Sequence, residues 1–271
     1  MTKSSTPKGN LGKPLALTLA IAAVFTLIFL CGKSEKLQEN GQKYREEGEP
    51  VVRTAKLRKQ LLTDDQALVT YIRQHLAHPP ALTAYNLTHM DRAHVSQYSH
   101  QSQNANGIFN AKSNGVFVEV RAWDGEQKSH SLYFERHLSW TGVLIEPEPS
   151  LFRTLLSKNR RAYAVHAALA TDDGHQEFRP KDTSLTSPPT IPLYSILQAL
   201  NTTHIDFLSL DVEGKELKVL NTIPWDKVKV RLMCVRADRT PGGPVFLSQF
   251  MEEQGYASLG VTENDIWFAF L

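Results

Sequence analysis

With 271 residues and a formal net charge of +2, the chain is long enough for one large domain with accessory segments, or for two small domains. This near balance of charge gives no indication of nucleic-acid binding, for which an excess of basic residues is typical. Its two cysteines, Cys31 and Cys234, lie in segments of different character, so we expect no intrachain disulfide framework.

An uncharged apolar run extends from Pro14 to Cys31. Its length is near the lower limit for a helix that crosses the hydrocarbon core of a membrane. A cleaved signal peptide is the alternative, but it would have a shorter apolar core and small residues at a cleavage site. Here Phe29, Leu30 and Cys31 close the run. We therefore expect a signal-anchor at residues 14–31, preceded by a short basic leader at residues 1–13.

The orientation of this anchor does not follow from charge, because lysines lie on both sides of it. A short leader before the span and a long folded part after it favour a luminal or extracellular carboxyl-terminal domain. Two N-x-T sequons, at Asn86 and Asn201, permit a luminal location in the endoplasmic reticulum, Golgi or endosome. Residues 32–63 are polar and predict a stalk without a core of its own.

Residues 64–114 lead into the main domain. Their apolar spacing predicts a helix that starts near Asp64 and ends before Pro79-Pro80. From Ala81 to Asn114 the sequence is polar and predicts a long irregular connection. The histidines of this connection have no metal-ligand spacing, so we expect a solvated loop and no metal site.

From residue 115 to 271, strand and helix patterns alternate. Strands are predicted at 116–120, 142–145, 162–169, near 177–178, 205–210 and 228–235, and helices at 129–138, 150–158, 193–200, 213–220 and 246–254. The last two apolar runs, 256–261 and 266–271, predict a β-hairpin. This order indicates an α/β fold with a mostly parallel sheet, helices on both faces and an antiparallel edge.

Three predicted strands end in acids: Glu119, Glu146 and Asp211. In a parallel sheet all three carboxylates reach the same edge, and Gly125 lies in the turn that follows the first of them. An acid about twenty residues beyond such a glycine turn is the group that binds ribose hydroxyls, and Glu146 lies at about that distance. For each acid by itself, a helix cap or a solvated strand end is the better explanation. Together they favour an adenosine-type ligand.

Several segments of the chain resemble the FkbM-type methyltransferase domain, namely FVEVRAWDGE, SLYFERHLSWTG, LIEPEPSLFRTLLSKNRRAY, IPLYSILQALNTTHIDFLSLDVEGKELKVLNTIPWDKV and FMEEQGY. The likeness extends from about Asp64 to Leu271 and is greatest for the arthropod, Star-like branch. Its most specific motifs are LIEPEP and SLDVEG, in this order. The resemblance implies a Rossmann-like methyltransferase fold that binds S-adenosylmethionine and, in active members, methylates hydroxyl oxygens of small molecules or sugars.

The Star-like branch implies a second role. The protein that gives the branch its name has one span near the amino terminus followed by this domain in the lumen. It is understood as an escort in vesicle-mediated transport of membrane-bound signalling precursors from the endoplasmic reticulum to the Golgi. The resemblance therefore leaves two alternatives open, an anchored methyltransferase and a catalytically inactive escort with a membrane-protein cargo.

Carried over motif by motif, the resemblance places Glu119 and Gly125 in the cofactor loop. It assigns Glu146 to the ribose hydroxyls and Asp211 to the reaction edge. No general base is secure in the family. Asp211 is the best catalytic candidate, to orient the acceptor hydroxyl or to take its proton.

The chain departs from the family pattern at two places. Arg121 stands where the family usually has glycine, and Val235-Arg236 stand where an acid is usual near the end of the fifth strand. A side chain at position 121 restricts φ and prevents the close backbone approach that glycine allows. Arg121 would either fill the cofactor cleft or pair with the carboxylate of S-adenosylmethionine.

Overall fold

The computed structural model describes residues 66–171 and 188–271. The predicted leader, anchor and stalk, and the short strand predicted near 177–178, lie outside the described residues. In the part of the chain that is described, no helix has the length and apolar character needed to cross a membrane.

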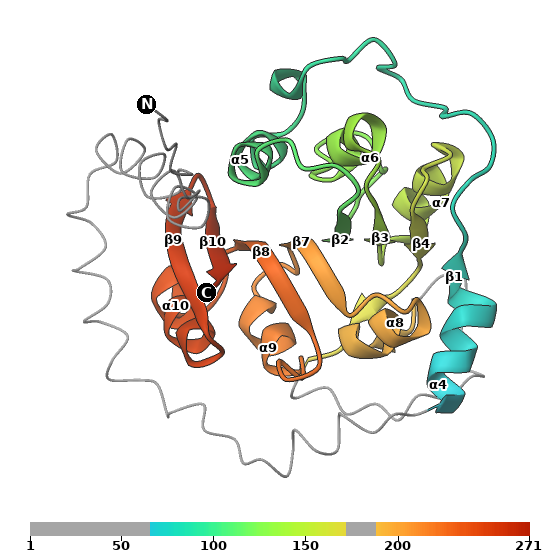
Figure 1. Cartoon of the computed structure of the whole chain (residues 1–271). Coiled ribbons are helices and arrows are strands. Elements are labelled where there is room, and N and C mark those ends of the chain that lie inside the picture. The colour runs from blue at the N-terminus through green and yellow to red at the C-terminus, as the bar shows by residue number, and fades with distance from the viewer. Residues whose placement is uncertain (1–65, 172–187) are drawn as a thin grey trace, which may run out of the picture. The chain divides into compact units, whose positions relative to one another are not determined.

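An eight-stranded sheet forms the centre of the fold (Figure 1). Its order is β1(Ala77–His78), β4(Tyr163–Val165), β3(Thr141–Ile145), β2(Val116–Val120), β7(His204–Leu210), β8(Lys229–Arg236), β10(Asp265–Phe270) and β9(Tyr256–Thr262). The five central strands, from β4 to β8, are parallel, whereas β1 and β10 run antiparallel to their neighbours. Chain order reverses between β2 and β7, and such a switch point is where open α/β sheets bind ligands.

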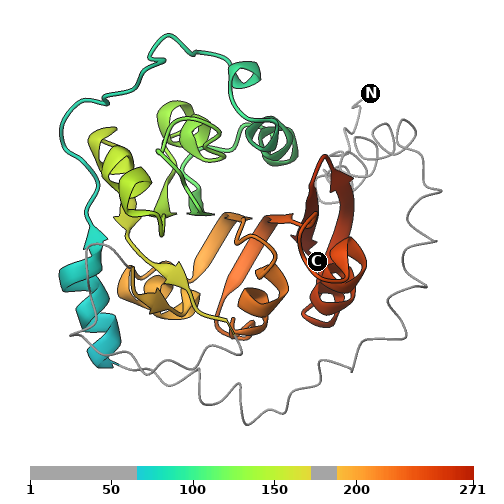
Figure 2. The ribbon, with the colours of Figure 1, turned by 180° about the vertical axis from the view of Figure 1, so that it is seen from behind.

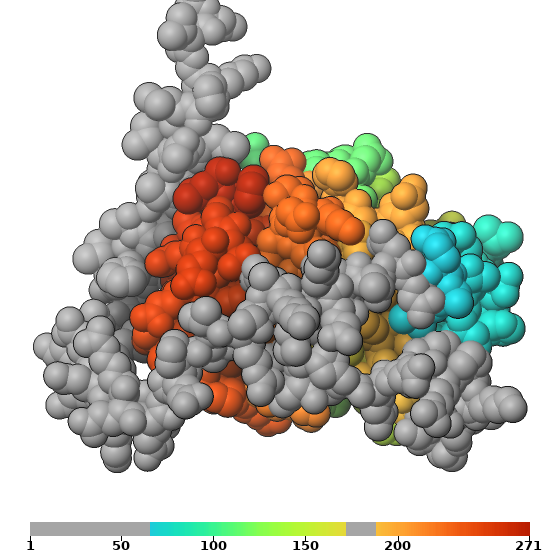
Figure 3. All heavy atoms as spheres, turned by 90° about the horizontal axis from the view of Figure 1, so that it is seen from below, coloured from blue at the N-terminus to red at the C-terminus, as the bar shows by residue number. Residues whose placement is uncertain are grey.

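Helices cover both faces of the sheet (Figures 1 and 2). One face carries α5(His100–Phe109), α6(Leu132–Leu138) and α7(Pro149–Ser157), and the other carries α4(Gln66–Tyr71), α8(Leu193–Ala199), α9(Glu216–Asn221) and α10(Gly243–Glu253). Successive strand residues alternate between the two hydrophobic cores, as Phe117 and Val118 do, because side chains of a strand point to opposite faces. The C-terminal hairpin and α4 lie at opposite edges of the sheet (Figure 3).

The predicted alternation of strands and helices is confirmed, and so is the terminal hairpin. The predicted strand 162–169 is wrong in its extent. It divides into β4, in the main sheet, and β5(Ala168–Leu169), which pairs with β6(Thr190–Ile191) in a separate two-stranded sheet. The apolar run is continuous in sequence, so it does not show where the pairing partner changes.

The prediction of an irregular connection over 81–114 is also wrong in part, because it contains a 3-10 turn, η2(Val95–Gln97), and the ten-residue helix α5. The Ser99 side chain caps α5 by accepting a hydrogen bond from the Ser102 amide, and Asn110 ends the helix in a left-handed conformation. Its buried residues are Ser102 and Ala105. Such small side chains leave no apolar periodicity that would indicate a helix.

Two helices begin later than predicted, both beside the sheet edge where the acids lie. The helix predicted from 129 begins at Leu132, and the one predicted from 213 begins at Glu216. In both cases the residues before the helix form a loop at the carboxyl end of a central strand. These two loops form much of the site described next.

Candidate functional site

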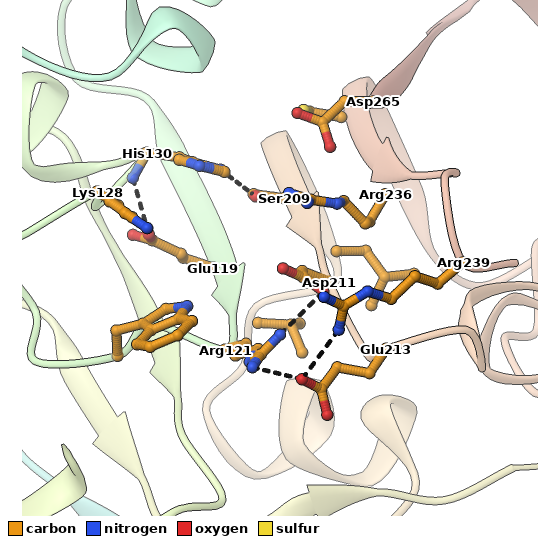
Figure 4. Close-up of a pocket in the computed structure, with 14 residues that line it drawn as sticks. Glu119, Arg121, Lys128, His130, Ser209, Asp211, Glu213, Arg236, Arg239 and Asp265 are labelled. Carbon is orange, nitrogen blue, oxygen red and sulfur yellow. Dashed lines mark hydrogen bonds and ion pairs between the residues drawn. The ribbon is translucent and has the colours of Figure 1, made fainter. Parts of the chain in front are cut away.

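A pocket of about 270 Å³ opens where β2 and β7 end (Figure 4). Its wall consists of residues from both strand ends, from the loop before α6 and from β8, β10 and the loop after β8, namely Glu119, Val120, Arg121, Trp123, Lys128, His130, Ser209, Leu210, Asp211, Glu213, Cys234, Arg236, Arg239 and Asp265. A second pocket of about 180 Å³ lies beside it, towards Pro147 and Ala167. The two pockets share Val120, Arg121, Asp211 and Glu213 as lining residues.

Glu119 is buried and holds the loop before α6 in place. Its carboxylate accepts hydrogen bonds from the Ser129 hydroxyl at 2.9 Å, from the His130 backbone amide at 2.7 Å and from the Ser131 amide at 3.2 Å. The Ser131 hydroxyl donates a further bond. These donors occupy the carboxylate, so Glu119 shapes the predicted cofactor loop from beneath and has little capacity left for a ligand.

Arg160 completes this support, although nothing in the sequence indicated it. Its guanidinium is buried, pairs with the Glu135 carboxylate at 3.0 Å and donates to the backbone carbonyl of Gly125. It also reaches the Ser131 hydroxyl at 3.1 Å. A single cation therefore links α6 to both ends of the loop.

The backbone after β2 is left-handed at alternate positions, with φ of +64° at Arg121, +54° at Trp123 and +76° at Gly125. A Cβ on Gly125 would lie 3.1 Å from Cγ of Leu155, so this glycine also allows close packing of α7. Position 121, where the resemblance implies glycine, keeps the conformation that glycine favours. The arginine occupies it with a side chain that projects over the strand ends.

The Arg121 side chain bridges the ends of β2 and β7 (Figure 4). Its guanidinium lies 2.5 Å from the Glu213 carboxylate and 3.4 Å from that of Asp211, and it stacks over the Trp123 ring at 4.6 Å. Arg239 approaches Glu213 from the other side at 3.4 Å. The bridge lies at the wall that the two pockets share, and Arg121 is one of the four residues that line both.

Glu146 follows β3 and is almost fully buried, with 1 % of its surface exposed. One carboxylate oxygen accepts from the Trp123 amide and the other from the Glu148 amide, both at 2.8 Å. Burial raises the pKa of this carboxyl, although the two amide hydrogen bonds and the nearby Arg121 act in the opposite direction. Glu146 thus ties the ends of β2 and β3 together beneath the cleft.

Asp211 lines both pockets, as its position at the end of β7 predicted, and its side chain is 23 % exposed. The loop that carries it is fixed by Glu216, a fully buried residue that sequence reasoning missed. Glu216 accepts from the Val212 amide at 2.8 Å and from the Thr240 hydroxyl at 2.6 Å. The sequence signal for this role was the acid two residues after the glycine of SLDVEGKE.

Further polar groups in the larger pocket were also missed. Nδ1 of His130 lies 2.6 Å from the Ser209 hydroxyl, and both residues line the pocket. Burial raises the pKa of the Cys234 thiol well above its ordinary value, and a hydrogen bond to Asp265 adds to this effect. The thiol therefore stays protonated and unreactive at neutral pH. Among residues 66–171 and 188–271, no cluster of three or more His, Cys, Asp or Glu side chains could hold a metal ion.

Residues 119–258, just over half of the chain, match the family model described as the methyltransferase FkbM domain. The chain belongs to the FkbM methyltransferase family. Its fold is the Rossmann-like methyltransferase fold that the resemblance implied, with a mostly parallel sheet and antiparallel strands at the C-terminal edge. Membership implies S-adenosylmethionine as the cofactor.

No curated protein matches the chain in sequence. Solved structures that are similar to it include the METTL16 methyltransferase domain, with 12 % identity, 78 % of this chain and 82 % of that chain covered, and a TM-score of 0.42. A methyltransferase from Pyrococcus furiosus has 10 % identity, coverage of 75 % and 96 %, and a TM-score of 0.40. The N-terminal domain of human METTL16 in complex with SAH has 10 % identity, coverage of 62 % and 68 %, and a TM-score of 0.35.

In the candidate site, acids end β2, β3 and β7 around a loop with left-handed residues, which is the arrangement expected for an adenosine-type ligand. Glu119 and Asp211 line the larger pocket, whereas Glu146 lines neither pocket. Yet each pocket alone is smaller than the 300–1,000 Å³ or so that is usual for small-molecule sites. Because Arg121 lines both pockets, a ligand that occupies both would have to displace its side chain.

Proposed function

We propose that the chain is a membrane-anchored methyltransferase that uses S-adenosylmethionine to methylate a hydroxyl oxygen of a small molecule or sugar. The main support for this proposal is the pair of pockets at the switch point, which share Asp211 and Arg121, follow the ends of β2 and β7 and reach Pro147 beyond β3. When bound, the cofactor supplies an electrophilic methyl group.

Different residues of this chain would shape the loop, contact the cofactor and orient the acceptor. Gly125 lets the loop pass close to α7, and Glu119 holds that loop in shape. Glu146 is 1 % exposed and lines neither pocket, so it would accept from ribose hydroxyls only after the cofactor displaces the side chains above it, with the lone pairs that Trp123 and Glu148 leave unused. Arg121 would leave its two carboxylates and pair with the carboxylate of the cofactor. Asp211, released in this way, would orient the acceptor hydroxyl.

A second candidate function is favoured by the same Arg121 bridge. If the bridge stays closed, the cleft remains two small pockets, and the chain would be a catalytically inactive member of the Star-like branch. It would then act as an escort in vesicle-mediated transport, with a membrane-bound signalling precursor as cargo. The anchor at 14–31 and a luminal or extracellular domain belong to both proposals.

The two exposed sequons offer a test of the luminal orientation. The side chains of Asn86 and Asn201 are exposed, and the Asn86 amide donates to the Ser157 carbonyl at 3.0 Å. If the domain is luminal, expression in a glycosylating cell should give a mass shift that glycosidase treatment and the Asn201→Gln substitution reduce. A sequon added to the exposed C-terminus is the control. If Asn86, Asn201 and this added sequon all carry no glycan, the luminal orientation is contradicted.

The enzymatic proposal is tested by the melting temperature of the full chain with S-adenosylmethionine, S-adenosylhomocysteine and ATP. A ligand that binds only the folded state raises the melting temperature. We expect stabilisation by the first two ligands and none by ATP, which shares the adenosine but lacks the methionine carboxylate. No stabilisation by any of them would contradict the enzyme and favour the escort.

A further inference from the structure

His130 is held at the larger pocket by contacts on both sides of its backbone. Its own amide donates to Glu119 at 2.7 Å, and the flanking Ser129 and Ser131 hydroxyls bind the same carboxylate. Arg160 contacts the Ser131 hydroxyl at 3.1 Å. The position of the His130 Cα is therefore fixed by buried groups, although the residue itself is only half-buried.

The side chain of His130 is oriented by a single contact. Nδ1 lies 2.6 Å from the hydroxyl of Ser209, a buried residue of β7. In the described part of the chain, the other ring nitrogen, Nε2, has no hydrogen-bond partner. Figure 4 shows the ring reaching from the β2 side towards Ser209 at the pocket wall. Imidazole with one nitrogen engaged and one free is the usual arrangement of a proton acceptor.

The carboxylates that line the same pocket are already engaged. Glu119 accepts several hydrogen bonds, as described above. Glu213 lies between Arg121 and Arg239, at 2.5 and 3.4 Å. Asp265 is buried and accepts a hydrogen bond of 2.6 Å from the Gln101 amide.

Two other groups at the pocket are less suited than His130 to accept a proton. Cys234 is buried and stays protonated at neutral pH. Asp211 is paired with Arg121 at 3.4 Å and lines both pockets, which suits it to orient an acceptor when that pair opens. His130 is therefore the lining group that combines an unengaged nitrogen with a fixed backbone.

We propose that His130 is the general base of the methyl transfer and that Ser209 positions its ring. This inference rests on the proposed function. Nε2 takes the proton of the acceptor hydroxyl while the oxygen forms a bond to the methyl carbon. The bond between that carbon and the sulfonium sulfur breaks, and its electron pair stays on sulfur. The imidazolium then loses its proton to solvent, so charge and protons balance.

The test uses matched substitutions in the full chain. His130→Asn places an amide near the position of Nδ1, which keeps the contact with Ser209 but removes the base, whereas Ser209→Ala keeps the base but removes its positioning contact. Binding of S-adenosylmethionine is measured by calorimetry, and transfer of its labelled methyl group is measured with glycerol and methyl glucoside as acceptors. We expect His130→Asn to bind the cofactor as the native chain does and to lose transfer by about 100-fold or more.

The Ser209→Ala variant should lose less activity than His130→Asn, and added imidazole should restore transfer to a His130→Ala variant. Native rates in His130→Asn, with cofactor binding intact, would overturn the assignment of the base. A native chain that does not bind the cofactor would instead overturn the proposed function, and the two failures are therefore distinguishable.

A second readout does not depend on catalysis. Diethylpyrocarbonate acylates an unprotonated ring nitrogen that is free of a partner. The matched control is His166, which is also half-buried and stacks on Phe152; its Nε2 donates to the Pro147 carbonyl at 3.2 Å, so only Nδ1, which is hindered by the adjoining Cβ, is left for acylation. In the cofactor-free chain we expect His130 to react several times faster than His166. The acylation of each histidine is followed by peptide mass spectrometry. Equal rates would contradict a free Nε2 at the pocket.

Discussion

Arg121 and Glu213 form an ion pair of 2.5 Å, and both residues hold left-handed backbone conformations, with φ of +64° and +54°. A left-handed conformation costs a residue with a side chain about 1–2 kcal/mol. The pair therefore joins the ends of β2 and β7 through two strained positions. Surrounding contacts maintain the strain: the Arg121 amide donates to the Ile145 carbonyl at 2.8 Å, and Glu216 fixes the loop of Glu213.

The strain at Arg121 leads to a prediction about stability. Arg121→Gly and Arg121→Ala both remove the bridge, but only glycine adopts φ of +64° without strain. We expect the glycine variant to be more stable than the alanine variant by about 1 kcal/mol, measured by urea unfolding. Equal stability would indicate that the loop after β2 is free to leave this conformation.

Gly125 should be sensitive for two reasons, its φ of +76° and its proximity to Leu155. We expect Gly125→Ala to lower the free energy of unfolding by about 1–3 kcal/mol. Gly255→Ala is the matched control, since its φ is +85° but its Cβ would lie 3.8 Å from Phe270, an ordinary contact. The difference between the two variants in urea unfolding isolates the packing against α7. A larger loss at Gly255 would refute the role given to this contact.

Arg160 should contribute strongly to the free energy of unfolding, because it is a buried partner of an ion pair. Arg160→Met leaves the Glu135 carboxylate buried without its partner, which should cost about 3–5 kcal/mol. The double variant Arg160→Met with Glu135→Leu removes both charges and should recover part of that loss. Both are measured by chemical unfolding. If the double variant loses more free energy of unfolding than Arg160→Met and Glu135→Leu lose together, the ion pair is not the reason for the effect.

Glu126 should make stability depend on acidity. Burial would raise the pKa of its carboxyl, but hydrogen bonds from Lys158, Thr88 and His89 outweigh this and lower it from 4.5 to about 2. Between these values the unfolded chain binds the proton more readily, so falling pH favours unfolding. The carboxylate contributes up to about 3 kcal/mol above pH 4.5 or so, and this is lost as pH falls towards 2.

The measurement is the free energy of unfolding of the native chain and of Glu126→Gln at several pH values. The native chain should lose its advantage over Glu126→Gln as the pH falls through this window, because the variant has no carboxylate to protonate at this position. A difference that stays constant with pH would show that Glu126 does not titrate as described.

The fold followed from sequence where apolar periodicity was strong, and failed where polar groups decide the structure. Val116–Val120 and His204–Leu210 are recognisable as buried strands because branched and aromatic residues fill them. The helix α5 buries Ser102 and Ala105, which gives no such pattern. The starts of α6 and α9 were misplaced because carboxylates hold the preceding loops open, a tertiary effect that periodicity does not record.

The sequence indicated where the candidate pocket lies but only part of how its residues are engaged. Acids at the ends of successive strands located the edge of the sheet, and there Asp211 and Arg121 line the same pockets. Glu119 and Glu146 lie at this edge too, yet backbone amides and hydroxyls occupy them, which the sequence does not show. His130 was missed because its partner, Ser209, is far away in sequence.

The central claim is that a cofactor site exists behind the Arg121 bridge. Its most direct test is calorimetric titration of the full chain with S-adenosylmethionine, beside the variants Arg121→Gly, Glu146→Ala and Arg239→Ala. Arg239 is the matched control, because it also contacts Glu213 but does not line the second pocket. We expect binding by the native chain, binding about tenfold weaker by Arg121→Gly because the partner of the cofactor carboxylate is lost, no binding by Glu146→Ala and little change in Arg239→Ala. Absence of binding in both the native chain and Arg121→Gly would contradict the account.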